Sequence, residues 1–160
     1  MAGLLHQIGI LLLLINYKEN YRQVLEQYET IANFRQLEND NYGINHCEVG
    51  ATLVESWQLD SLISDAILFQ GTDPQELLSS PTLLKIIAVA GPMSSPPSTD
   101  IKEQNVQNAK NLLKLPQDEI LACLADALDE CKLVLANLGF SADALFAETT
   151  VGKDADKVRE

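Results

Sequence analysis

Residues 38–67, ENDNYGINHCEVGATLVESWQLDSLISDAI, decide the fold because they carry the clearest helix signals of the chain. Asn45 followed by Glu48 is typical of an N-cap with a reciprocal carboxylate at the third helical position, so a helix is predicted to start at His46. Apolar residues then recur every three or four positions, and Asp60 is suited to cap a second helix. The stretch is therefore predicted to fold as a loop, a helix, a tight connection and another helix.

The first of these two helices carries an apolar stripe, which consists of Val49, Leu53, Val54 and Trp57. Residues at this spacing share one face of a helix. We expect the whole stripe, including Trp57, to lie in the core. Gly50 and Ala51 have little or no side chain, so we also expect another helix to approach closely at these positions.

The preceding segments also show helical patterns. Residues 2–16, AGLLHQIGILLLLIN, are apolar almost all round, which predicts one helix enclosed by other helices. The apolar pattern starts almost at Met1, so the domain is expected to be incomplete at its N-terminus. Residues 17–31 place tyrosines and aliphatic residues on one face, and this stripe is interpreted as core-facing rather than as a ligand face.

The C-terminal half is predicted to be helical as well. Asp73-Pro74 and Ser80-Pro81 predict two helix starts, and helices are expected over 101–115 and 117–138. The predicted organisation is a helical core over 1–92, a Pro/Ser-rich connector over 93–100, C-terminal helices packing on the core over 101–147 and a charged tail over 148–160. No stretch shows strand-like alternation, so the expected fold class is all-α, a compact multi-helix array.

Composition limits the possible functions. The chain has 160 residues, of which 46% are hydrophobic, and this length is typical of a single soluble domain. Its 11 basic and 23 acidic residues give a net charge of −12. Nucleic acid and anionic membranes are bound through clustered Lys and Arg, so neither is expected as a partner.

Targeting and redox signals are also absent from the sequence. The apolar run at residues 8–15 is much shorter than the ~20 residues that a membrane-spanning helix needs. It has neither a preceding basic residue nor a following cleavage site of the signal-peptide kind. Cys47, Cys123 and Cys131 are odd in number and lack framework spacing, so reduced thiols and a cytoplasmic location are expected.

Two motifs resemble a known family. GLLHQIG, residues 3–9, resembles the GLLHDIG segment of HD-type domains. YGINHCEVGATLVESWQL, residues 42–59, resembles the G-x-x-H-x-x-V-G-x-x-L-x-x-x-W-x-L signature of the HD-related output domain, the HDOD family. The positions that carry this resemblance are Glu38, Gly43, His46, Val49, Gly50, Leu53, Trp57 and Leu59.

The resemblance implies an all-helical bacterial signalling module, related to metal-dependent HD and HD-GYP phosphohydrolases but regarded as non-catalytic. It implies that the chain corresponds to the C-terminal portion of the family's domain and that helices of the N-terminal portion are missing. Modules of this family are often joined to receiver, cyclic-dinucleotide phosphodiesterase or diguanylate cyclase domains. Other signalling proteins or domains are therefore the expected partners.

The chain departs from the active HD pattern at the metal ligands. His6 is followed by Gln7 where an active site has a His-Asp pair, and Phe69-Gln70 stands where relatives often have two histidines. A neutral amide is a poor metal ligand compared with a carboxylate. We therefore expect no catalytic residue, no metal site and no cofactor. His6 and His46 are interpreted as hydrogen-bonded structural histidines rather than relic ligands, and Cys47 lacks a nameable base that would make it a nucleophile.

The expected function is a non-catalytic regulatory module that acts through protein–protein interaction. A metal-dependent phosphohydrolase acting on nucleotides or cyclic dinucleotides is the alternative, and an unrelated helical adaptor is a weaker third hypothesis. If the apolar faces meant for the missing helices are exposed, self-association would bury them, so a homo-oligomer is expected.

Overall fold

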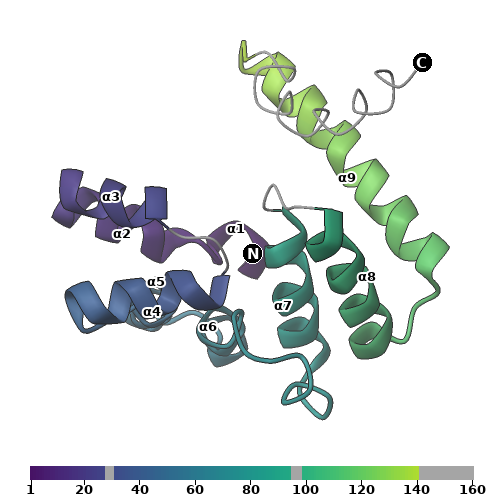
Figure 1. Cartoon of the computed structure of the whole chain (residues 1–160), viewed down its shortest axis with the longest axis horizontal. Coiled ribbons are helices and arrows are strands. Elements are labelled where there is room, and N and C mark those ends of the chain that lie inside the picture. The colour runs from purple at the N-terminus through teal and green to yellow at the C-terminus, as the bar shows by residue number, and fades with distance from the viewer. Residues whose placement is uncertain (28–30, 95–98, 141–160) are drawn as a thin grey trace, which may run out of the picture. The chain divides into compact units, whose positions relative to one another are not determined.

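The computed structural model describes residues 1–27, 31–94 and 99–140. Within these ranges the regular elements are helices and there is no strand, so the predicted all-α fold class is confirmed. Figure 1 labels the helices in chain order. The chain divides into two units. One comprises residues 1–95 with 111–113, and the other comprises residues 96–110 with 114–160.

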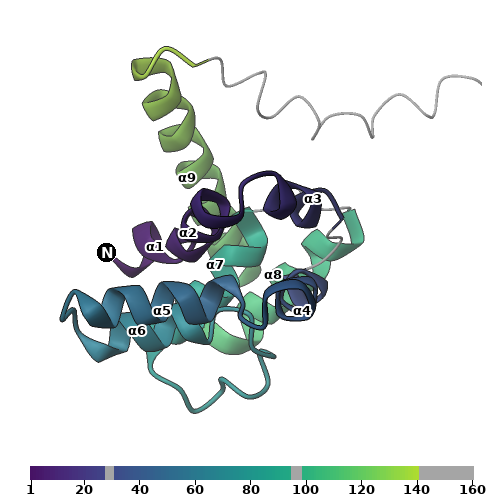
Figure 2. The same ribbon diagram turned by 90° about the vertical axis from the view of Figure 1, so that its left-hand side faces the viewer.

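Seven helices lie in the described part of the first unit. They are α1 (Ala2–Leu5), α2 (Ile8–Tyr17), α3 (Glu19–Gln27), α4 (Ile31–Tyr42), α5 (His46–Ser56), α6 (Ser61–Leu68) and α7 (Thr82–Ser94). Helix α5 packs against both α2 and α6, and α6 also packs against α1 and α7. Figure 2 shows α5 and α6 side by side. Helix α5 is therefore a central element of this unit.

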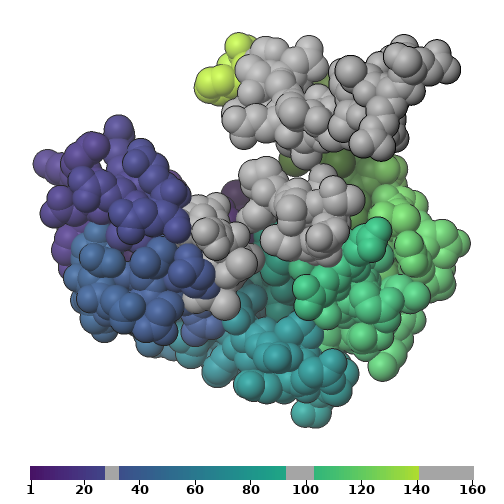
Figure 3. Space-filling view, viewed as in Figure 1, coloured from purple at the N-terminus to yellow at the C-terminus, as the bar shows by residue number. Residues whose placement is uncertain are grey.

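The core of the first unit consists of apolar clusters between pairs or triples of helices. Helices α5 and α6 meet at Ala51, Val54 and Ile67. Helices α2, α3 and α4 meet at Leu13, Tyr21, Val24 and Phe34. Helices α1, α6 and α7 meet at Ala2, Ala66, Leu84 and Ile87. In the space-filling view of Figure 3 the atoms of α3 and α4, coloured purple to blue, lie against each other.

Helices α2 and α5 approach each other at two glycines. A Cβ atom added to Gly9 would lie 1.9 Å from the carbonyl oxygen of His46. One added to Gly50 would lie 3.1 Å from Cγ2 of Ile67 and 3.4 Å from the backbone nitrogen of Gly9. The prediction that a helix approaches closely at Gly50 is therefore confirmed, and both α2 and α6 do so.

The prediction of one enclosed helix over residues 2–16 is wrong. Helix α1 ends at Leu5 and α2 begins at Ile8, because Gln7 leaves the helical conformation with φ −106° and ψ 11°. Side chains replace backbone bonds at the break, as described for His6 below. The two helices are not enclosed either, because Leu4, Leu11 and Ile15 are exposed. We call these exposed apolar residues the outer side of α1 and α2.

The prediction that Trp57 lies in the core is also wrong, because Trp57 is 50% exposed. Trp57 is the C-cap residue of α5, and the next residue, Gln58, reverses the chain with a φ of 56°. The buried part of the stripe therefore ends about one turn earlier, at Val54, which is fully buried.

Of the two helix starts expected after α6, one is confirmed. Helix α7 begins at Thr82, where the carbonyl oxygen of Pro81 accepts the backbone N–H groups of Leu84 and Lys85. Residues 73–80 form successive turns rather than a helix, although the Asp73 carboxylate accepts the N–H of Gln75 at 2.8 Å, as a capping residue does.

The two C-terminal helices are confirmed as α8 (Thr99–Leu113) and α9 (Gln117–Asn137). Helix α9 ends at the C-cap residue Leu138, and Gly139 follows with a φ of 81°. Residues 95–98 of the predicted connector and the predicted tail, 148–160, lie outside the described residues. Among the described helices, none combines the length and the hydropathy that crossing a membrane requires.

Candidate functional site

The site is centred on the carboxylate of Glu38, which lies on α4 and is fully buried. One carboxylate oxygen, Oε1, accepts a hydrogen bond from the hydroxyl of Tyr21 on α3. The other, Oε2, accepts the backbone N–H of His46 at 3.0 Å and lies 2.6 Å from its Nδ1. A buried carboxylate requires such donors because burial removes its water. Three helices therefore converge on one charged group.

Local sequence brings Glu38 and His46 together. Gly43 ends α4 with a φ of 70°, and its N–H donates to the carbonyl oxygen of Asn39 at 2.8 Å. Asn45 then caps α5: its Oδ1 accepts the N–H groups of Cys47 and Glu48, and the Glu48 carboxylate accepts the N–H of Asn45 at 3.0 Å. The predicted capping box and the helix start at His46 are both confirmed. The tight turn places the start of α5 beside the end of α4.

The imidazole of His46 is enclosed, with the residue only 4% exposed. Its ring stacks on Phe34 with 4.9 Å between centroids, and its Nε2 lies 3.4 Å from the Sγ of Cys47. Burial lowers the pKa of His46, but the hydrogen bonds to Cys47 and Glu38 outweigh that effect and raise the pKa to about 9. This raised pKa favours a protonated His46 that donates from Nδ1 to the Oε2 of Glu38.

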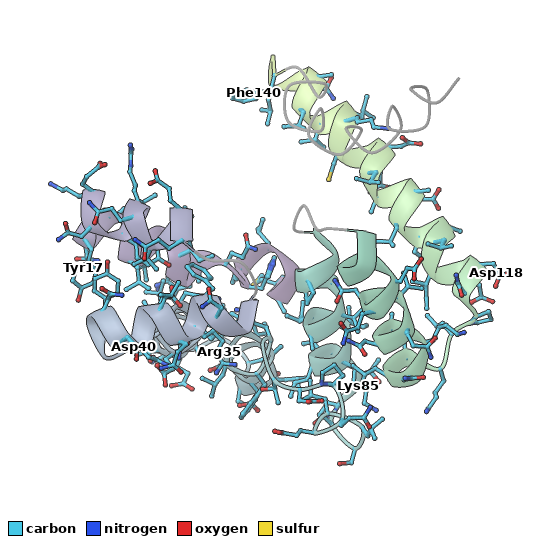
Figure 4. The ribbon with its side chains drawn as sticks, viewed as in Figure 1. Tyr17, Arg35, Asp40, Lys85, Asp118 and Phe140 are labelled. Atoms are coloured by element: carbon cyan, nitrogen blue, oxygen red, sulfur yellow. The ribbon has the colours of Figure 1, made fainter. Side chains whose placement is uncertain are left out.

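Tyr21 completes the pair from the other side. Burial, followed by its hydrogen bond to Glu38, raises the pKa of Tyr21 well above its ordinary value, so the hydroxyl remains a donor. Its ring packs near Phe34 and Tyr42, with centroids 6.3 and 5.9 Å away. The ring of Tyr42 in turn packs at a tilt against that of Tyr17, which Figure 4 labels at the end of α2, with 4.2 Å between centroids. The polar group thus lies inside an aromatic enclosure.

The second histidine, His6, lies at the break between α1 and α2. Its Nδ1 is 2.7 Å from the carbonyl oxygen of Gly3. Its own carbonyl oxygen accepts the side-chain amide of Gln70 at 2.7 Å, and the same amide nitrogen lies 3.4 Å from the Sγ of Cys47. Gln70 therefore connects the helix break to α5. Among the described residues, the Nε2 of His6 is a buried nitrogen without a hydrogen-bond partner.

The signature residues have different structural roles. Glu38 and His46 form the buried pair, Gly43 makes the turn before α5, and Gly50 lies at the helix crossing. Val49 and Leu59 pack at the edges of apolar clusters, and Leu53 is half-buried. Trp57 is half exposed, and Gly43 in the turn is exposed as well.

Sequence reasoning missed the polar roles of Tyr21 and Gln70. The aromatic stripe predicts Tyr21 to be a core residue, and it is fully buried, but its hydroxyl also donates to Glu38. From the sequence, Gln70 is distinguished only by standing where relatives often have a histidine. A buried Glu needs donors from other helices, and that requirement is the signal that points to a nearby tyrosine.

Comparison with known proteins gives one family. Residues 1–72 match the family model of the HDOD domain. The comparisons with curated proteins and with solved structures gave no match. The matched range contains both sequence motifs and the buried pair. Residues 1–72 are therefore similar to an HDOD domain, the similarity that the two motifs indicated.

An HD-type relationship implies a metal centre, but the side chains of this site do not fit one. In the part of the chain that the structure describes, no three His, Cys, Asp or Glu residues are grouped so as to hold an ion. Both ring nitrogens of His46 have protein partners, and Gln7 is exposed. The Nε2 of His6 could supply one metal ligand, whereas a catalytic metal needs several convergent ligands and an open coordination position.

Proposed function

We propose that this chain is a non-catalytic regulatory module of the HDOD kind, working in a bacterial cytoplasm by contact with other signalling proteins. The observation that supports this proposal is the engagement of His46 by Glu38 and Cys47 inside the core. The Nδ1 of His46 contacts the Glu38 carboxylate at 2.6 Å and its Nε2 lies 3.4 Å from the Cys47 Sγ, so both ring nitrogens that could hold a metal have protein partners. The histidine of the motif has a structural role in this proposal.

The outer side of α1 and α2 is the contact surface that we propose for the module. Leu4, Leu11 and Ile15 are 85%, 54% and 68% exposed. Residues 2–16 contain no Asp, Glu, Lys or Arg, although the chain as a whole has a net charge of −12. An exposed apolar surface without charge favours burial by another protein. This surface is suited to a partner protein or to self-association.

A metal-dependent phosphohydrolase is the second candidate. The buried, unpartnered Nε2 of His6 favours it, because an imidazole nitrogen in that state is available as a ligand. Such a site needs at least two further ligands near His6, and Gln7 and Gln70 offer only amides there. The candidate therefore depends on ligands that would have to move toward His6.

A hydrolysis assay separates the two functions. The purified chain and a His6→Ala variant are incubated with nucleoside phosphates and cyclic dinucleotides in the presence of Mn²⁺ or Mg²⁺. We expect no turnover above the protein-free rate in either sample. Turnover that is lost in His6→Ala but kept in the exposed-surface control Gln23→Ala would overturn the proposal, since it would show that His6 takes part in catalysis.

A further inference from the structure

Helix α9 carries a seven-residue repeat that the proposed function does not use. Apolar side chains recur at alternating spacings of three and four through the helix and its C-cap. These positions, which we call the α9 seam, are Leu121, Leu124, Leu128, Cys131, Leu135 and Leu138. An alternating three-and-four repeat is the pattern by which one helix packs along another.

Four residues of the α9 seam are exposed, and the other two, Leu124 and Leu135, are half-buried. Every residue of α9 is described, and Ile120 is its only buried one. Leu121 and Leu128 are each 46% exposed and Leu138 is 66% exposed. Figure 4 places Asp118 near the first turn of this helix and Phe140 just beyond its end. A helix of this length with an exposed leucine repeat has an apolar face that another surface is able to bury.

The charges of α9 lie away from the seam. Glu119, Asp126, Asp129 and Glu130 fall on the opposite side of the helix when residues are placed 100° apart. Lys132, which flanks the seam, donates to Asp129 at 2.9 Å and is thereby directed toward that charged side. Two copies of this acidic helix would therefore meet along the seam without opposing their carboxylates.

We propose that the α9 seam is a self-association surface and that its occupant is α9 of a second copy of the chain. Leucines at both core positions of the repeat are complementary to an identical repeat, because each leucine fits between side chains of the facing helix. The α9 seam carries no charge that would require a complementary charge on a different protein. This association is independent of what the outer side of α1 and α2 contacts.

Two cysteines report on this pairing. Cys131 lies in the seam, whereas Cys123 lies on its flank, and both are exposed. In a parallel pair the two Cys131 residues face each other. In an antiparallel pair that matches every seam position they are offset by three residues, which is about 4.5 Å along the axis. A short bis-maleimide therefore links Cys131 in either orientation, and Cys123 in neither.

The first test is crosslinking of the full chain with that reagent. We expect a crosslinked dimer from the wild type and from Cys123→Ser, and its loss in Cys131→Ser. Buried Cys47 is present in all three samples and does not distinguish them. Crosslinking that survives in Cys131→Ser, or that is absent from the wild type, would overturn the proposal.

The second test is the molar mass in solution, measured by light scattering. We expect twice the 17.6 kDa of one chain for the wild type, and one chain mass for Leu128→Lys. Leu133→Lys is the matched control, because Leu133 is 64% exposed but lies on the charged side of α9. It should remain dimeric, and circular dichroism checks that all three are equally helical. A monomeric wild type, or a Leu128→Lys variant that stays dimeric, would contradict the α9 seam without bearing on the hydrolysis assay.

Discussion

At the scale of single residues, the buried Glu38 carboxylate accepts hydrogen bonds from three protein donors in place of water. These are the Tyr21 hydroxyl, the His46 backbone N–H and the His46 imidazole, from two different helices. Taking an ionised carboxylate out of water without partners costs several kcal/mol. The three hydrogen bonds offset that cost only while α3, α4 and α5 keep their positions, so the stability of the first unit should depend strongly on this one side chain.

Replacing Glu38 by Gln should therefore be strongly destabilising. The amide has one acceptor oxygen and would point an NH₂ group toward groups that are themselves donors. We expect the free energy of unfolding to fall by about 3 kcal/mol, as when one partner of a buried ion pair is removed. Urea unfolding of Glu38→Gln measures this loss. The exposed α3 variant Glu26→Gln is the control, and an equal stability of the two variants would contradict the role of Glu38.

His46 gives the stability a pH dependence. Its pKa is raised from 6.5 in the unfolded chain to about 9 in the folded protein. A raised pKa means that the stabilisation is fully present below pH 6.5 and is lost as the pH rises through about 9. The loss should be on the order of 3 kcal/mol for a shift of this size. Urea unfolding between pH 6 and pH 10 measures it.

The control for this pH dependence is the pair of variants His46→Gln and His6→Gln. The first removes the raised pKa and should flatten the curve of unfolding free energy between pH 6.5 and 9. The second should keep the slope of the wild type. A slope that persists in His46→Gln would assign the titration to a different group.

The residues of the site could be predicted only in part. Asn45, Glu48 and His46 follow each other closely in the sequence, so capping rules alone gave the start of α5. The hydroxyl of Tyr21 and the Glu38 carboxylate are 17 positions apart, and the amide of Gln70 contacts a carbonyl 64 positions away. Contacts between distant residues depend on how helices pack, which local spacing does not determine.

At the scale of elements, the crossing of α2 and α5 depends on Gly9. A methyl group there would have to occupy a position 1.9 Å from the carbonyl oxygen of His46. The obstacle is backbone, so relief requires a movement of a whole helix. That movement would also displace His46 from Glu38. The crossing and the buried pair are therefore linked.

Gly9→Ala should destabilise the first unit by more than about 3 kcal/mol, at the upper end of overpacking effects. Gly50→Ala should cost less, about 1 kcal/mol, because its nearest obstacle is a side-chain atom, the Cγ2 methyl group of Ile67 at 3.1 Å, and not backbone. Gly3→Ala is the matched control, since nothing lies within 4 Å of its added Cβ atom. Thermal unfolding of the three variants should rank them in this order, and equal effects of Gly9→Ala and Gly3→Ala would refute the tight crossing.

Most helices could be predicted from their patterns and their caps, including α5, α6 and α9. The break between α1 and α2 could not. Residues 2–16 form an uninterrupted apolar run, and the carbonyl oxygen freed at His6 is satisfied by Gln70 on a distant part of the chain. The prediction that Trp57 is buried is wrong because local spacing does not show where a helix ends. Trp57 fits the spacing of the stripe, but α5 ends at the residue before it.

At the scale of the whole molecule, the two units suggest separate tasks. The first unit, which contains the HDOD-like range 1–72, carries the buried pair and the outer apolar side of α1 and α2. The second contains the α9 seam. On our proposals, one unit contacts a signalling partner and the other joins two copies of the chain. Substitutions in the α9 seam should therefore leave the unfolding of the first unit unchanged.

The central claim is that the histidines of the HD-like motif serve packing and not metal chemistry. Elemental analysis of the purified full chain, after dialysis against Mn²⁺, Fe²⁺ or Zn²⁺ and removal of free ion, tests this claim most directly. We predict no stoichiometric metal, and the same trace content in the wild type, His6→Ala and His46→Ala. Two transition-metal ions per chain that disappear in His6→Ala and His46→Ala would contradict it and would favour a phosphohydrolase.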